Sequence, residues 1–166
     1  MIIRTETDAD FDAIRRVNRG AFGQEAEGKL VDDLRDGGYA RLSLVAEEDG
    51  LIVGHILFSE LPIQTAEGVI DALSLAPMAV LPDHQRRGIG TALVQEGLRL
   101  CKSLGHHIVV VLGHVDYYPR FGFSASLAEP LTCAYAGPAL MALELVPGAL
   151  DGVSGELKYP APFQDV

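Results

Sequence analysis

The sequence predicts an α/β (α+β) fold in which helices flank one mixed sheet. Apolar strand-like and amphipathic helix-like segments follow one another in the order β-α-α-β-β-β-α-β-(short α)-β-β. Asp49-Gly50 between two apolar runs indicates a hairpin and therefore antiparallel pairing. The wholly apolar segment Ile108–Leu112 is typical of a strand buried on both faces, as in parallel sheets.

The first half of the chain is predicted to hold two helices and the hairpin. A short apolar strand over residues 2–5 precedes a helix that Thr7 or Asp8 can cap and that continues to about Asn18. A second helix is expected over 25–35, ended by two glycines. The hairpin strands are expected over 42–47 and 51–60.

The second half is predicted to begin with one long apolar strand over 69–80, followed by a helix over 88–104. Pro77 lies inside that strand and cannot donate to a ladder, which a strand unpaired on one side tolerates. The remaining strands are expected over 108–112, 127–133, 140–145 and 154–159.

Composition limits the classes of function. The chain has 166 residues, 48% of them hydrophobic, so a single domain over 1–166 can form without a disulfide or a metal. A net charge of −10 disfavours nucleic acid and anionic membranes as partners. The N-terminus lacks a signal-peptide pattern, and Cys101 and Cys133 lie in no metal-binding motif. We therefore expect a cytoplasmic protein with reduced thiols and no metal site.

The most informative segment is the turn that leads into the helix at 88–104. It consists of Gln85, Arg86, Arg87, Gly88, Ile89, Gly90 and Thr91. The glycines keep side chains away from a helix start, where unpaired N–H groups and the helix dipole attract anions. Arg86 and Arg87 add two positive charges. The segment therefore predicts an anion site suited to a pyrophosphate.

The turn resembles three known phosphate-binding patterns to different extents. A P-loop requires Gly-Lys-[Ser/Thr], which is absent, and a dinucleotide-binding GxGxxG motif requires glycine where Leu93 stands. The pattern [Gln/Arg]-x-x-Gly-x-[Gly/Ala] of acetyl-CoA loops is met by Gln85, Gly88 and Gly90. An ordinary helix start with two solvated arginines is the alternative without function.

Three segments carry a resemblance to a known family, and they read MAVLPDHQRRGIG (78–90), LGHVDYYPRFGF (112–123) and GELKYPAPF (155–163). In this order they resemble the GCN5-related N-acetyltransferase (GNAT) family, and in particular its YhbS-like subgroup of small bacterial N-acetyltransferases. The resemblance covers nearly the whole chain. It implies the acyl-CoA N-acyltransferase fold, with a mostly antiparallel sheet splayed between its two central parallel strands. It also implies acetyl-CoA as cosubstrate and transfer of its acetyl group to a primary amine by direct attack in a ternary complex.

The resemblance also implies roles for particular residues. Tyr118, in a Tyr-x-x-x-Gly-Phe setting, would be the general acid that protonates the departing thiolate, and Tyr117 is the adjacent rival. A tyrosine with a pKa near 10 keeps its proton at neutral pH, as this role requires. The cofactor-binding residues would be Met78, Ala79 and Val80 through their backbone, together with Gln85, Arg86, Arg87, Gly88, Ile89, Gly90 and Thr91.

Several questions stay open at this stage. The general base has no clear counterpart among Glu60, Asp71 and His114, and solvent is an equal alternative. The acceptor could be a free amino acid, a polyamine, an aminoglycoside-like amine or a protein N-terminus, and the acidic surface favours a small cationic amine. A non-catalytic acyl-CoA sensor and a Rossmann-type nucleotide-binding module are the alternative functions. Whether the chain forms a homodimer is also open.

Overall fold

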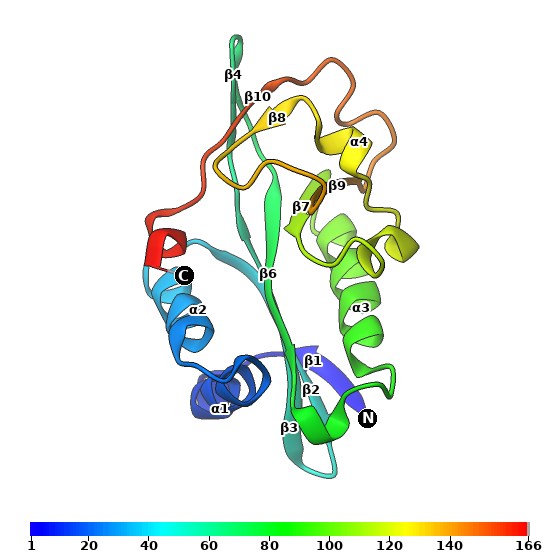
Figure 1. Cartoon of the computed structure of the whole chain (residues 1–166). Coiled ribbons are helices and arrows are strands. Elements are labelled where there is room, and N and C mark those ends of the chain that lie inside the picture. Colours follow the sequence, from blue (N-terminus) through cyan, green and yellow to red (C-terminus); the bar gives the residue numbers. More distant parts are fainter. Residues whose placement is uncertain (166) are drawn as a thin grey trace. The chain divides into compact units, whose positions relative to one another are not determined.

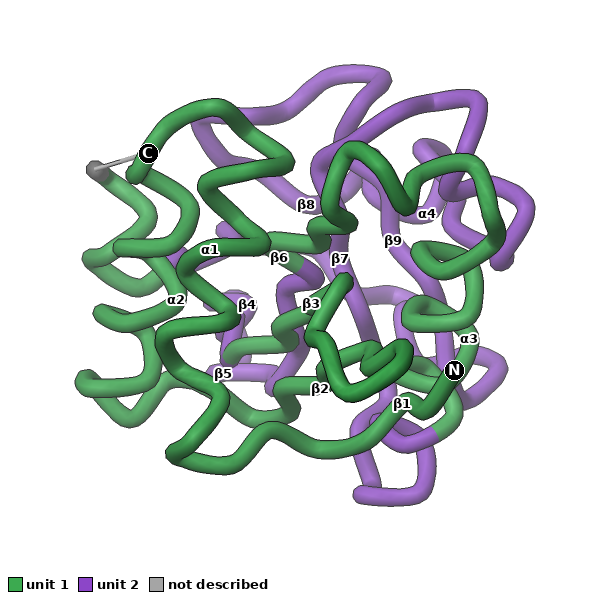
Figure 2. Tube along the Cα trace, turned by 90° about the horizontal axis from the view of Figure 1, so that it is seen from below, with its two compact units in different colours: residues 1–59, 76–99, 160–166 green, residues 60–75, 100–159 purple. Residues whose placement is uncertain are grey.

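The computed structural model describes the backbone of residues 1–165 and divides the chain into two compact units (Figure 2). Unit 1 contains Met1–Ser59, Ala76–Arg99 and the segment from Pro160 onward. Unit 2 contains Glu60–Leu75 and Leu100–Tyr159. That the whole chain behaves as one domain stays a prediction.

Unit 1 is built on strands in the order β1-β2-β3-β6. These are β1 (Ile2–Thr5), β2 (Ala40–Glu48), β3 (Leu51–Glu60) and β6 (Leu73–Val80), whose last five residues belong to this unit. β1 and β3 both pair antiparallel with β2, as the hairpin signal predicts. The helices are α1 (Phe11–Phe22), α2 (Ala26–Asp36) and the first part of α3 (Ile89–Ser103), with one-turn 3-10 helices at Asp8–Asp10 (η1), Pro82–His84 (η2) and Ala161–Asp165 (η4).

The helices of unit 1 cover both faces of its strands. On β3 the buried His55 contacts Asn18 of α1, while a Cβ on the neighbouring Gly54 would lie 3.0–3.1 Å from Leu93 and Ile89 of α3. Successive strand residues point to opposite faces, so α1 lies on one face and α3 on the other, with α2 beside α1 (Figure 1).

Unit 2 holds two groups of strands. The first residues of β6 pair parallel with β7 (Ile108–Leu112) at Leu73 and Ser74, and β7 pairs antiparallel with β9 (Leu140–Glu144). A second sheet has the order β5-β4-β10-β8, with β4 (Ile63–Thr65), β5 (Gly68–Ile70), β8 (Leu131–Thr132) and β10 (Gly155–Leu157). The unit's core is a buried cluster of Leu61, Ile63, Ala72, Ile108, Val110, Ala128, Leu131, Leu140, Ala142, Leu150 and Leu157. Two short helices, η3 (Tyr118–Phe121) and α4 (Ala125–Ala128), complete it.

Parallel and antiparallel strands flanked by helices confirm the predicted α/β class with a mixed sheet. No helix within residues 1–165 is both long and apolar enough to cross a bilayer.

The expectation of one long strand over 69–80 is wrong. The segment is divided into β5 and β6, and β5 folds back on β4. The turn between β4 and β5 is closed by Thr65, whose hydroxyl donates to the Gly68 carbonyl at 2.8 Å and accepts from the Glu67 N–H at 3.2 Å. This side-chain turn reverses the chain so that β5 pairs with β4. Asp71 and Ala72 lie in neither strand, so the apolar run is interrupted there, before β6 begins.

The expectation of a strand over 127–133 is also wrong. Ser124 caps α4, accepting a hydrogen bond from the Leu127 N–H at 3.4 Å. Pro130 follows the helix, and only Leu131 and Thr132 remain as the strand β8. A local cap and a proline therefore decide this segment, although its apolar composition resembles that of a strand.

Candidate active site

The glycine-containing turn lies in unit 1, between β6 and α3. Its backbone is left-handed at two residues, Arg86 with φ 63° and Gly88 with φ 84°. Directly after the second, the Gly88 carbonyl accepts a hydrogen bond from the Ala92 N–H at 3.0 Å, so α3 begins here. The first N–H groups of a helix have no intrahelical acceptor, which makes this turn suited to anions. Glycine is favoured at 88 because a residue with a side chain adopts this backbone angle only at an energetic cost.

Gln85 fixes the turn to the end of β6. Its Nε2 donates to the Val80 carbonyl oxygen at 3.0 Å, and its backbone N–H donates to the Pro82 carbonyl at 3.3 Å. The side chain that the sequence pattern assigns to the cofactor loop therefore contacts the protein itself. In this geometry Gln85 holds the loop's shape.

The two arginines of the turn differ in their surroundings. The Arg87 guanidinium forms an ion pair with Glu48 at 2.8 Å, and its side chain is about half exposed. Arg86 is exposed and has no ion-pair partner within the described chain. Arg86 is therefore the cation of this turn that is free to meet a phosphate.

The strand residues expected to face pantetheine precede this turn. Ala79 and Val80 are buried and Met78 is half-buried, all in the part of β6 that belongs to unit 1. The pairing of β6 with β7 involves Leu73 and Ser74, upstream of these three. The other residues expected to bind the cofactor, from Gln85 to Thr91, lie in the same unit.

Tyr118 lies in unit 2, at the start of η3, and is buried with 7% of its surface exposed. Its ring meets Tyr117 edge-on with centroids 5.1 Å apart, and Phe123 with centroids 5.7 Å apart. Burial, together with the neighbouring Tyr117, raises the pKa of Tyr118 to about 12. The phenol therefore keeps its proton throughout the physiological range, which suits a proton donor.

The candidate bases remain scattered in unit 2. Glu60 ends β3 and is half-buried, while His114 is exposed and uses its backbone carbonyl to accept from the N–H groups of Tyr117 and Tyr118. Asp71 lines a cavity of about 410 Å³ together with His106 and His107. This arrangement singles out no base among the three.

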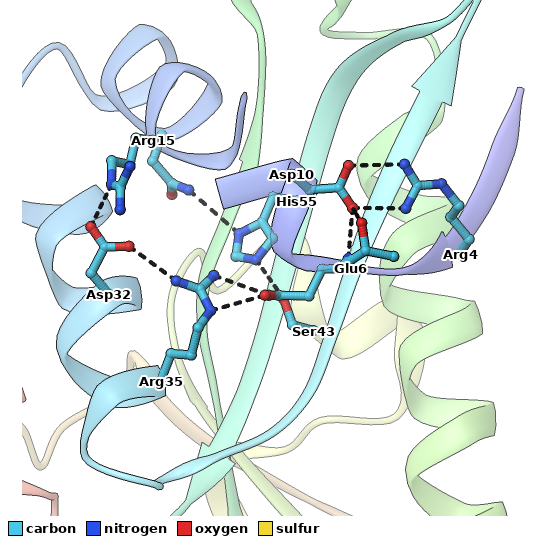
Figure 3. A network of polar contacts seen from close by, with 10 residues as sticks. Arg4, Glu6, Asp10, Arg15, Asp32, Arg35, Ser43 and His55 are labelled. Carbon is cyan, nitrogen blue, oxygen red and sulfur yellow. Dashed lines mark hydrogen bonds and ion pairs between the residues drawn. The ribbon is translucent and has the colours of Figure 1, made fainter. Parts of the chain in front are cut away.

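A buried polar network in unit 1 is absent from the expectations drawn from the sequence (Figure 3). His55 is fully buried, with Nε2 2.9 Å from the Ser43 hydroxyl and Nδ1 3.4 Å from the Asn18 amide nitrogen. Nearby, Arg35 of α2 binds Glu6 through two hydrogen bonds of 2.9 and 3.1 Å. The network joins α1 to β2 and β3, and joins α2 to Glu6, the residue that follows β1. No sequence motif predicts it.

The side chains that could bind a metal and the buried cysteine have the following surroundings. Within residues 1–165 no three His, Cys, Asp or Glu side chains gather in a way that could hold a metal ion. Cys101 is buried in α3, and desolvation raises the pKa of its thiol to about 12. It therefore remains a neutral packing residue at physiological pH.

Comparison with known proteins identifies the class. A family model described as an acetyltransferase (GNAT) domain matches residues 2–126. The N-acetyltransferase YhbS of Escherichia coli K12 is 36% identical over 166 residues, covering 98% of this chain and 98% of that protein. With the mixed sheet and the glycine turn, these matches define an acyltransferase. The chain belongs to the GNAT acetyltransferase family.

Two solved structures are similar over almost the whole chain. The crystal structure of YhbS from Escherichia coli in complex with CoA has 35% sequence identity and a TM-score of 0.91, covering 98% of this chain and 91% of that one. A GNAT family acetyltransferase from Brucella melitensis in complex with acetyl-CoA has 37% identity and a TM-score of 0.81, covering 98% and 97%.

Proposed function

We propose that this protein transfers the acetyl group of acetyl-CoA to a primary amine by direct attack in a ternary complex. The observation that carries the proposal is the left-handed turn at Arg86 and Gly88, which opens the start of α3 beside an uncommitted arginine. The relatives crystallised with CoA and acetyl-CoA support this choice of cosubstrate.

In the proposed binding mode the pyrophosphate of acetyl-CoA lies at the turn. Arg86 supplies charge, the first N–H groups of α3 donate hydrogen bonds, and Gly88 permits the close approach of backbone to phosphate. Gln85 acts through its bond to Val80 by keeping the turn in shape. Met78, Ala79 and Val80 offer backbone to the pantetheine arm, and Arg87 is shared between the phosphate and Glu48.

In the proposed chemistry a neutral amine attacks the thioester carbonyl carbon. A new C–N bond forms, the C–S bond breaks, and the CoA thiolate takes a proton from the hydroxyl of Tyr118. The phenolate then recovers a proton from solvent, and the amide nitrogen loses its extra proton to water. The products are an N-acetyl amide and CoA thiol, and a water chain serves as the base because no side chain is singled out for that task.

A small cationic amine is the acceptor class that the charge supports best. The chain carries a net charge of −10, which attracts cations at long range. The same net negative charge repels the anionic cosubstrate at long range. The positive charge of the turn is therefore needed to bind it.

Replacing Gly88 by valine tests the binding mode. A Cβ at Gly88 would meet no atom within 4 Å, but the left-handed φ of 84° disfavours a β-branched residue, and its side chain would stand where the phosphate must approach. We expect CoA affinity, measured by calorimetry, to fall by at least about 100-fold, the value of two charge-assisted hydrogen bonds. Unchanged affinity in folded Gly88→Val protein would reject the loop as the pyrophosphate site.

Gly23→Val is the matched control. Gly23 has φ 71° and open space around its Cβ position, and it lies at the end of α1 in the same unit. This variant carries the same backbone strain and should keep wild-type CoA affinity. Including NAD as a second ligand separates the proposal from a nucleotide-binding module, which would bind NAD more tightly than CoA.

An assay of turnover distinguishes an acetyltransferase from a non-catalytic acyl-CoA sensor. Release of CoA thiol from acetyl-CoA is measured with a panel of primary amines consisting of free amino acids, polyamines, aminoglycosides and a peptide N-terminus. We expect at least one amine to be acetylated, with mass spectrometry showing the added acetyl group. Tight CoA binding without acetylation of any panel member would favour the sensor.

A further inference from the structure

The residue that follows β7, Gly113, lies against the Cδ2–Cε2 edge of the Tyr118 ring. A Cβ built on Gly113 would lie only 2.9 Å from Tyr118 Cδ2 and 3.5 Å from Cζ, with Cε2 closer still. The Gly113 N–H donates to the Ala139 carbonyl at 3.1 Å, which holds this point of the backbone beside the entry to β9. The φ of Gly113 lies outside the left-handed region, so backbone conformation does not require a glycine here. The close approach to the Tyr118 ring is what requires a glycine at this position.

The other sides of the ring are enclosed by aromatic residues and by its own backbone. Tyr117 and Phe123 meet it edge-on, and Phe121 lies with its centroid 6.4 Å away at a tilt of 53°. The Tyr118 N–H donates to the His114 carbonyl at 3.3 Å. An extra methyl group at 113 would therefore have to displace the ring, because the backbone at Gly113 is held by its hydrogen bond to Ala139.

We propose that Gly113 is a positioning residue whose missing side chain sets where the Tyr118 hydroxyl stands. The proposal rests on the proposed function, in which that hydroxyl protonates the thiolate. Proton transfer depends on donor and acceptor being within hydrogen-bond reach, and a displacement of about 1 Å can cost about 100-fold in rate. Gly113 itself touches neither substrate nor proton in this scheme, and acts only through the Tyr118 ring beside it.

The test is a double-mutant cycle on kcat and KM. Gly113→Ala should lower kcat by about 10- to 100-fold with KM for acetyl-CoA nearly unchanged, and Tyr118→Phe should lower kcat by about 100-fold. If Gly113 acts through the hydroxyl, the double variant should be no slower than Tyr118→Phe alone. Additive losses, or a wild-type kcat in Gly113→Ala, would overturn the positioning role. The rates are measured with the panel amine that is acetylated fastest.

The matched control is Gly28→Ala. A Cβ at Gly28 in α2 would lie no closer than 3.6 Å to its neighbours, which is ordinary contact, so this variant should keep wild-type kcat and KM. The outcome for Tyr118→Phe distinguishes the two proposals. Wild-type kcat in that variant rejects Tyr118 as the acid, whereas an impaired Tyr118→Phe beside an unimpaired Gly113→Ala rejects only the role of Gly113.

A stability cycle covers the case in which Gly113→Ala does not fold. Tyr118→Ala removes the ring, so adding Gly113→Ala to this variant should change Tm by less than about 2 °C. Gly113→Ala in the protein that keeps the ring should lower Tm by more. An equal loss of Tm in both backgrounds would mean that the ring is not the reason for the glycine. That result would overturn the proposal whether or not Tyr118 is catalytic.

Discussion

The surroundings of Tyr118 favour the protonated phenol, which the proposed role of this residue requires. An exposed tyrosine ionises near pH 10, and the burial of Tyr118 raises its pKa to about 12. The raised pKa means that the folded state disfavours the phenolate, so the associated stability is present below pH 10 and is lost as the pH rises toward 12. Over the whole physiological range the residue is a proton donor.

This shift predicts the alkaline side of the pH profile. We expect kcat, measured at saturating acetyl-CoA, to show no loss attributable to Tyr118 up to about pH 10, because the phenol is still protonated there. Tyr118→Phe should be slower at every pH, with the same profile shape in this range. An alkaline decline centred below pH 10 that disappears in Tyr118→Phe would contradict the assignment.

At the scale of secondary-structure elements, His55 joins α1 to β2 and β3. The Asn18 amide nitrogen donates to the Ile14 carbonyl at 3.0 Å and has one hydrogen left for His55 Nδ1, so the Nε2–H of the ring donates to Ser43. The histidine is therefore neutral, and burial lowers its pKa to about 3. These three side chains hold the helix and the strands together without a net charge.

The neutral His55 predicts a loss of stability in acid. Between pH 6.5 and about 3 the unfolded chain binds a proton at this residue that the folded protein does not bind. The free energy of unfolding should therefore fall, by up to about 1.4 kcal/mol per pH unit from this one group. Urea unfolding at pH 7, 6 and 5 measures it, and the slope should be smaller in His55→Gln. Equal slopes in both proteins would contradict a neutral buried histidine, and His107→Gln, an exposed histidine, is the control.

The helices and strands also show which parts of the secondary structure can be predicted from the sequence. The hairpin strand at 51–60 and the strand at 108–112 are found as expected, because turn chemistry and β-branched burial are local signals. The prediction of a single strand over 69–80 is wrong because apolar composition reveals neither the pairing of β5 with β4 after the Thr65 turn nor the break at Asp71 and Ala72 before β6. The helix α4 was mistaken for a strand because a single serine cap decides so short an element.

The candidate site likewise combines features that the sequence predicts with features that it does not. The turn from Gln85 to Thr91 was recognised because its glycines and arginines are consecutive in sequence. The contact of Gly113 with Tyr118 cannot be predicted from the sequence, because it depends on how the chain folds back after β7. The pairing of Arg87 with Glu48 joins residues 39 positions apart, which no local pattern contains.

At the scale of the whole molecule, the chain forms two compact units that are both built on β6. We propose that they unfold together as one domain, because losing β6 removes a strand from each. Leu34→Ala in unit 1 and Leu140→Ala in unit 2 replace buried leucines, and each should cost about 2–5 kcal/mol. Both should lower the temperature of one and the same calorimetric transition. Two transitions, each moved by only one of the variants, would show two domains.

The left-handed backbone at Arg86 has a consequence for attempts to improve the protein. An L-residue at φ 63° costs about 1 kcal/mol or more, and glycine would adopt the same angle without strain. Selection for heat resistance alone would therefore favour Arg86→Gly, and would remove the cation that the proposed cosubstrate needs. A thermostable variant found in this way should bind CoA more weakly than its parent, because stability and ligand recognition place opposite demands on this one position.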